Sequence, residues 1–85
     1  MKTWIKVPGY AAEDVYYDDK TGRVYARVAP HVDVFASEEQ GPQLCTAIIS
    51  EPFLRSGESA ISNDESASFV GADKAKAYIE SLEFL

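Results

Sequence analysis

The side chains best able to do chemistry in this sequence are a lone histidine, a lone cysteine and several serines. His31 stands two residues before Asp33 on one side of an expected strand, so an imidazole–carboxylate pair is sterically possible. A metal site needs three or four ligands, and the chain has no second His and only one Cys to supply them. The serines lack a Gly-x-Ser-x-Gly nucleophile turn. We expect no catalytic residue, no metal and no cofactor.

Cys45 lies within a nearly continuous apolar run at residues 44–49. A nucleophilic cysteine needs a nearby base and positive charge, so we expect a buried, inert thiol. A single cysteine also excludes an intrachain disulfide and favours a reducing compartment. The first residues lack an apolar core of signal-peptide length, and no stretch approaches the roughly 20 apolar residues that span a bilayer. These features predict a cytoplasmic protein without membrane association.

Length and charge narrow the class of protein further. The chain has 85 residues, which suits one domain over residues 1–85, and its apolar fraction of 46% is enough for a packed core. Its net charge is −6 and is unevenly placed. Residues 1–30 carry five basic and four acidic side chains, whereas residues 31–85 carry three basic and ten acidic ones. A chain of this sign disfavours extended contact with nucleic-acid phosphates.

Aromatic residues gather in the first third of the chain, beside Lys2, Lys6, Arg23 and Arg27. Tyr and Trp anchor many protein interfaces, while an aromatic and basic sheet face is also typical of single-strand nucleic-acid readers. Alternation over residues 23–28 places Arg23, Tyr25 and Arg27 on a solvated side. We predict partner contact by four aromatic residues: Trp4, Tyr16, Tyr17 and Tyr25.

Acidic residues dominate the stretch from residue 33 to residue 65, where Arg55 is the only basic side chain. If the loops bring these carboxylates together, they would steer the protein toward a basic surface, as a mimic of nucleic-acid charge does. An ordinary solvated rim would have the same composition. The acidic residues that we predict to contact the partner are Glu38, Glu39, Asp64 and Glu65.

The expected elements are strands followed by one helix. Gly22 can take the positive φ that closes a hairpin between residues 15–17 and 23–28. Apolar residues at i, i+3, i+4 and i+7 predict a helix over residues 74–82, with Asp73 in its first turn. Residues 50–68 are expected to form a loop, a short helical turn or an exposed hairpin of 59–62 with 65–69. The other expected strands are residues 3–7, 31–35 and 44–49, the last one inside the sheet.

This order of elements predicts an α+β fold, with an antiparallel sheet of four or five strands and one C-terminal helix packed on one face. The opposite face of the sheet is then either solvated or buried against a partner. We therefore expect a non-enzymatic protein-binding module, because the sequence shows no catalytic motif and the fold leaves one sheet face for a partner.

In size, acidity, absence of catalytic motifs and sheet-then-helix order, the chain resembles short accessory proteins of bacteriophages and prophages, including anti-CRISPR proteins. The resemblance implies an inhibitor that occupies a basic or nucleic-acid-binding surface of a host complex. Two other functions stay open at this stage. One is a single-stranded nucleic-acid-binding domain, and the other is a homo-oligomeric structural protein, with a homodimer as its simplest form.

Overall fold

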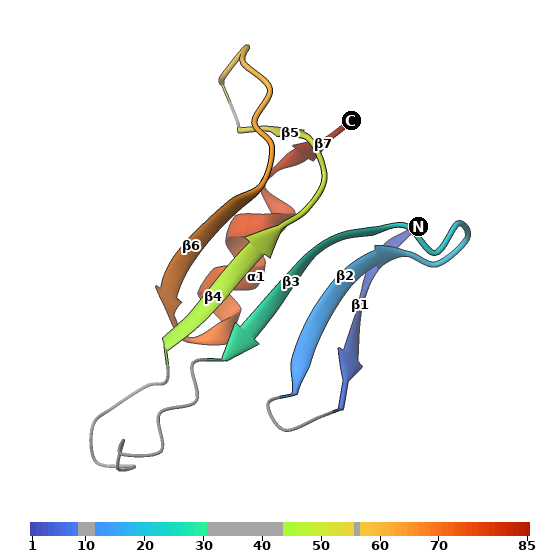
Figure 1. Cartoon of the computed structure of the whole chain (residues 1–85), viewed down its shortest axis with the longest axis vertical. Coiled ribbons are helices and arrows are strands. Elements are labelled where there is room, and N and C mark those ends of the chain that lie inside the picture. Colours follow the sequence, from blue (N-terminus) through green and yellow to red (C-terminus); the bar gives the residue numbers. More distant parts are fainter. Residues whose placement is uncertain (9–11, 31–43, 56) are drawn as a thin grey trace.

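The computed structural model describes residues 1–8, 12–30, 44–55 and 57–85 (Figure 1). The strand expected at residues 31–35 lies outside these ranges. The elements are β1 (Lys2–Val7), β2 (Glu13–Asp18), β3 (Val24–Pro30), β4 (Leu44–Ile49), β5 (Phe53–Leu54), β6 (Glu65–Val70), α1 (Ala72–Glu80) and β7 (Glu83–Phe84).

The main sheet has five strands in the order β1-β2-β3-β4-β6, and every neighbouring pair is antiparallel. A second sheet of two short strands joins β5 to β7 near the C-terminus. The helix α1 packs against β3, β4 and β6. The predicted α+β fold, with an antiparallel sheet and one C-terminal helix, is therefore confirmed, and β4 lies inside the sheet as expected.

The hairpin between β2 and β3 is closed by residues suited to a tight turn. Asp18 accepts hydrogen bonds from the backbone N–H groups of Lys20 and Thr21 through its carboxylate, at 2.8 and 3.2 Å. Gly22 then adopts a φ of 75°, which residues with a Cβ rarely tolerate, and donates to the carbonyl of Asp18 at 2.8 Å. Local chemistry therefore fixes this turn, as the sequence predicts.

Two hydrogen-bonded carboxylates should make the fold sensitive to acid. The backbone N–H groups of Lys20 and Thr21 lower the pKa of Asp18 from 3.8, and a hydrogen bond from Arg23 lowers the pKa of Glu51 from 4.5. Groups with a lowered pKa in the folded state stabilise it fully above their unfolded pKa, and that contribution is lost as pH falls through the folded pKa. We expect the free energy of unfolding in urea to fall below about pH 4.5, and less steeply in the Asp18→Asn and Glu51→Gln double variant. An unchanged slope in that variant would contradict this assignment.

A β-bulge interrupts the pairing of β2 with β3. Tyr16 pairs with Ala26 but Tyr17 pairs with Val24, so Tyr25 is an extra residue without an opposite partner in the register. The extra residue turns Tyr25 and Ala26 toward the same side, and both are buried. The prediction that Tyr25 lies on the solvated side with Arg27 is therefore wrong. Strict alternation holds only where the ladder is regular.

The region from residue 50 to residue 68 is more ordered than expected. Phe53 exchanges two backbone hydrogen bonds with Ser62, at 3.0 and 2.9 Å, and β5 pairs with β7. Strand β6 pairs with β4 over its whole length, from Leu44 opposite Val70 to Ile49 opposite Glu65. The predicted hairpin of 59–62 with 65–69 is therefore wrong, because β6 completes the main sheet.

The core lies between α1 and one side of the sheet. Alternate residues of β3 and β4 face the helix, whose Ala75 and Ile79 are fully buried, and Gly71 precedes the helix with a φ of 94°. Asp73 lies in the first turn of α1, as predicted. The buried core consists of Ala26, Val28, Cys45, Ala47, Ile49, Phe53, Ala75, Ile79 and Leu82.

Candidate interaction surface

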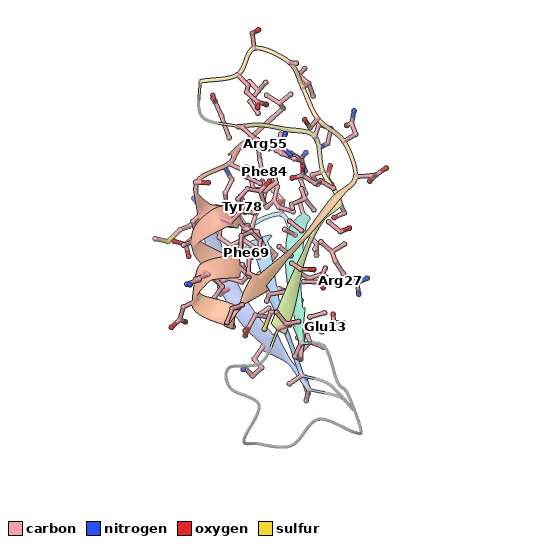
Figure 2. All side chains as sticks on the ribbon, turned by 90° about the vertical axis from the view of Figure 1, so that its left-hand side faces the viewer. Glu13, Arg27, Arg55, Phe69, Tyr78 and Phe84 are labelled. Atoms are coloured by element: carbon pink, nitrogen blue, oxygen red, sulfur yellow. The ribbon has the colours of Figure 1, made fainter. Side chains whose placement is uncertain are left out.

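The side of the main sheet that faces away from α1 is here called the open face. Figure 2 shows Glu13 and Arg27 on this side and Phe69 and Tyr78 on the side of the helix. Register and alternation place three residues from each long strand on the open face. These residues are Thr3, Ile5, Val7, Glu13, Val15, Tyr17, Val24, Arg27, Ala29, Leu44, Thr46, Ile48, Ser66, Ser68 and Val70.

The open face is mainly apolar and has no net charge. Its large exposed aliphatic side chains come from four different strands and include Ile5, Val24, Leu44 and Val70, which are 44 to 48% exposed. Its only ionised residues are Glu13 and Arg27, whose carboxylate and guanidinium lie 3.3 Å apart. In a chain of net charge −6, this neutral apolar surface differs from the rest. Such surfaces commonly mark sites of protein contact.

A shallow hollow lies at one end of β4 and β6. It has a volume of about 220 Å³ and is lined by Ile48, Ile49, Ser50, Asp64, Glu65 and Ser66. Asp64 has a φ of 50° there, in the left-handed region that Asp tolerates better than most residues. The hollow adjoins the open face at Ile48, and its polar lining residues lie at the edge of that apolar surface.

The predicted aromatic contact residues lie mostly on the helix side. Rings of Trp4 and Tyr16 are 4.7 Å apart, and the ring of Tyr25 lies 4.9 Å from that of Phe84. Trp4 and Tyr16 pack against the core, and Tyr25 is only 6% exposed. Burial raises the pKa of the Tyr16 hydroxyl. Of the four predicted aromatic residues, Tyr17 is on the open face.

Trp4 is tied to the helix by polar contacts as well. Its indole Nε1 donates to Glu80 at 2.8 Å, and the ammonium of Lys76 lies 5.4 Å from the centre of its ring. Lys76 also pairs with Asp14 at 3.3 Å, and Lys6 pairs with the same carboxylate at 3.6 Å. Asp14 is 8% exposed, and these two cations compensate its burial. This cluster holds α1 against the β1–β2 hairpin.

The four acidic residues predicted to contact a partner do not share one environment. Glu38 and Glu39 lie outside the described residues. Glu65 pairs with Arg55 and accepts a hydrogen bond from the hydroxyl of Tyr78, so its charge is compensated within the chain. Asp64 lines the hollow beside Ile48. The structure therefore does not join Glu65 and Asp64 into one free acidic patch.

Several basic side chains near the N-terminus are also compensated. Arg23 pairs with Glu51 at 3.1 Å, and its guanidinium lies 4.9 Å from the centre of the Tyr25 ring. Lys6 pairs with Asp14, and Arg27 pairs with Glu13. The aromatic and basic residues thus contact one another and nearby carboxylates, an arrangement that leaves less free positive charge for phosphate groups than the sequence suggests.

The described residues hold no cluster of three or more His, Cys, Asp or Glu side chains that could bind a metal ion. His31 and Asp33 lie outside them. Cys45 is buried, as predicted, and its burial raises the pKa of the thiol. Within the described ranges, α1 is too short to cross a bilayer and no other helix is a candidate.

The chain matches no protein-family model, no curated protein and no solved structure. Its function must therefore be inferred from its own surface. The apolar side chains of the open face are not part of the buried core described above, so the packing of the described residues does not explain them.

Sequence reasoning missed the aliphatic residues of the open face. A signal was present, because residues 44–49 are apolar on both faces of the strand, a pattern typical of strands covered on both sides. In residues 3–7, likewise, Ile5 and Val7 alternate with Trp4 and Lys6, which gives each face an apolar residue. The sequence predicts recognition through aromatic rings, whereas the open face holds mainly aliphatic side chains and, of the predicted rings, Tyr17.

Proposed function

We propose that this chain is a non-enzymatic protein-binding module whose contact surface is the open face. One observation carries the proposal: among the described residues, α1 covers one side of the sheet, and the other side presents apolar residues with a single compensated ion pair. When a partner covers exposed apolar area of this kind, the area is removed from water, and this burial stabilises the complex. The same observation favours aliphatic contact over recognition through the aromatic residues.

A contact between protein surfaces fits the open face better than contact with nucleic acid. Recognition of a nucleic acid needs free cations along a groove or rings that can stack on bases. On the open face, Arg27 is paired with Glu13, and Tyr17 supplies the ring. An apolar sheet surface instead suits another apolar protein surface.

Substitution of Ile48 by Glu tests the proposal in a capture experiment. Ile48 lies in the middle row of the face, paired with Arg27 on one side and Ser66 on the other. A carboxylate at this position must lose its hydration on association, and its neighbour Arg27 is already paired with Glu13, so we expect capture of a protein partner from a bacterial lysate to fall at least about tenfold. Nuclease treatment should leave the captured amount unchanged.

Ala77→Glu is the matched control, because it adds the same charge on the exposed side of α1. This variant should capture as much partner as the unmodified chain, and both variants should retain the circular dichroism of the native fold. Capture that disappears after nuclease treatment, or that persists in Ile48→Glu, would contradict the proposal.

A further inference from the structure

The described residues form two layers, the main sheet and one helix. The shortest dimension of the chain is 17 Å, which accommodates one helix on one sheet. Strand β4 has Ala47 and Ile49 on its helix side and Leu44 and Ile48 on the open face. Strands that are apolar on both faces are typical of sheets covered on both sides. The open face thus has the composition of a surface that is covered in the working protein.

The shape and charge of the open face limit what can cover it. Its five strands of about six residues extend over about 24 Å by 20 Å, or roughly 480 Å² per face. Two such faces in contact remove about 1,000 Å² from water, near the lower limit for a specific interface. The hollow that the described residues form beside Ile48 is shallow, and the charges of the face sum to zero. A complementary surface is therefore broad, apolar and neutral.

We infer that this complementary surface is the open face of a second copy of the chain, so that the protein is a symmetric homodimer. This inference rests on the proposed function and names the partner. A second copy presents the same apolar side chains and the same twist of the sheet. It also presents Glu13 beside Arg27, and a two-fold axis lets each charge meet its opposite from the other copy. A strongly basic partner would instead need acidic groups on this face beyond Glu13.

The dimer has four layers, with two sheets inside and the two α1 helices outside. Sheets that pack face to face lie about 10 Å apart, with their strands within about 30° of each other. The middle row of the face, which includes Ile5, Val15 and Ile48, forms the centre of the interface. Arg27 extends from this row, half-exposed in the single chain, and its guanidinium remains close to the carboxylate of Glu13.

The net charge of the chain predicts how self-association depends on salt concentration. Each copy carries a net charge of −6, whereas the two ionised residues of its open face, Glu13 and Arg27, sum to zero. Two copies therefore repel each other at long range while their open faces attract at contact. Salt screens the repulsion, so self-association should strengthen between about 0.05 M and about 0.5 M salt. Binding to a basic partner would weaken over the same range.

Sedimentation equilibrium of the purified chain tests the inference directly. We expect dimers to form between about 1 μM and about 1 mM, as suits an interface of this size, and more tightly at the higher salt concentration. Ile48→Glu and Ile5→Lys should each weaken the dimer at least about tenfold. Ile5→Lys makes the chain less negative, so weakening in this variant reflects lost apolar contact rather than added repulsion. Ala77→Glu should leave the dimer unchanged.

Three results would overturn the inference. The first is a monomer at about 1 mM at both salt concentrations, since the interface would then be too weak to matter. The second is a dimer that Ile48→Glu and Ile5→Lys leave intact. The third is a dimer that Ala77→Glu disrupts, which would place the contact on α1. If the chain stays monomeric but captures another protein through Ile48, the inference fails and the proposed function stands.

Discussion

Replacing Phe53 with Ala should remove most of the stability of this protein. Phe53 is fully buried in β5, its ring centre lies 6.3 Å from that of Phe84, and the guanidinium of Arg55 lies 5.5 Å from it. Loss of a buried Phe side chain lowers the free energy of unfolding by about 3 to 5 kcal/mol. The whole chain should have on the order of 5 to 10 kcal/mol. Urea unfolding followed by circular dichroism would show a much lower midpoint.

Phe53→Leu is the control for this substitution. Leucine keeps most of the apolar volume, so we expect a loss of about 1 to 1.5 kcal/mol. Ser68→Ala, on the open face, should change the stability by less than about 0.5 kcal/mol. If Phe53→Ala lowers the free energy of unfolding by less than about 1 kcal/mol, Phe53 is not enclosed in solution, and the ordering of residues 50–55 against β7 would be wrong.

The second large effect should come from Trp4→Ala, with a loss of about 2 to 3 kcal/mol in the free energy of unfolding. The indole packs on Tyr16, donates to Glu80 and lies beneath Lys76, so its removal weakens the contact between the β1–β2 pair and α1, where the Lys76–Asp14 ion pair remains. The loss is smaller than for Phe53 because Trp4 is only partly buried. Circular dichroism is the appropriate measurement, since the variant lacks the only tryptophan.

Trp4→Phe separates the contribution of the aromatic ring to the free energy of unfolding from that of the indole N–H. It keeps an aromatic ring against Tyr16 and loses the exposed hydrogen bond to Glu80, so we expect a loss of about 1 kcal/mol. The folded fraction of Trp4→Ala should still associate through the open face, because Trp4 lies on the opposite side of the sheet. Full stability combined with lost association would show instead that Trp4 is a contact residue, as the sequence suggested.

Local features of the sequence determined much of this fold. The turn at Asp18 to Gly22, the strand at residues 3–7 and the apolar run of β4 each depend on neighbouring residues, and each is found where it was predicted. The helix predicted over residues 74–82 is found two residues earlier, as α1 at Ala72–Glu80, so Leu82 lies beyond its end. Asp73 occupies the first turn of the helix, as predicted. These predictions succeeded because turn chemistry and side-chain period act over a few residues.

Long-range pairing decided the elements that were missed. The pairing of β6 with β4 joins residues about 20 positions apart, and β7 pairs with β5 across about 30. The sequence allows a strand at residues 65–69 but pairs it with residues 59–62, whereas the hydrogen-bonding edge of β4 is the partner that Glu65–Val70 takes in the structure. The sequence of this segment alone does not contain that information.

Tertiary structure also decided which side of the sheet is available for recognition. Alternation shows that Trp4 and Ile5 face opposite sides, but the position of α1 determines which of them is covered. A single bulge then moves Tyr25 to the covered side. The sequence by itself determined a sheet with one helix and one uncovered face. The packing of that helix and the register of one hairpin placed Trp4, Tyr16 and Tyr25 on the covered side and left a mainly aliphatic open face, because burial depends on what lies opposite a side chain in space.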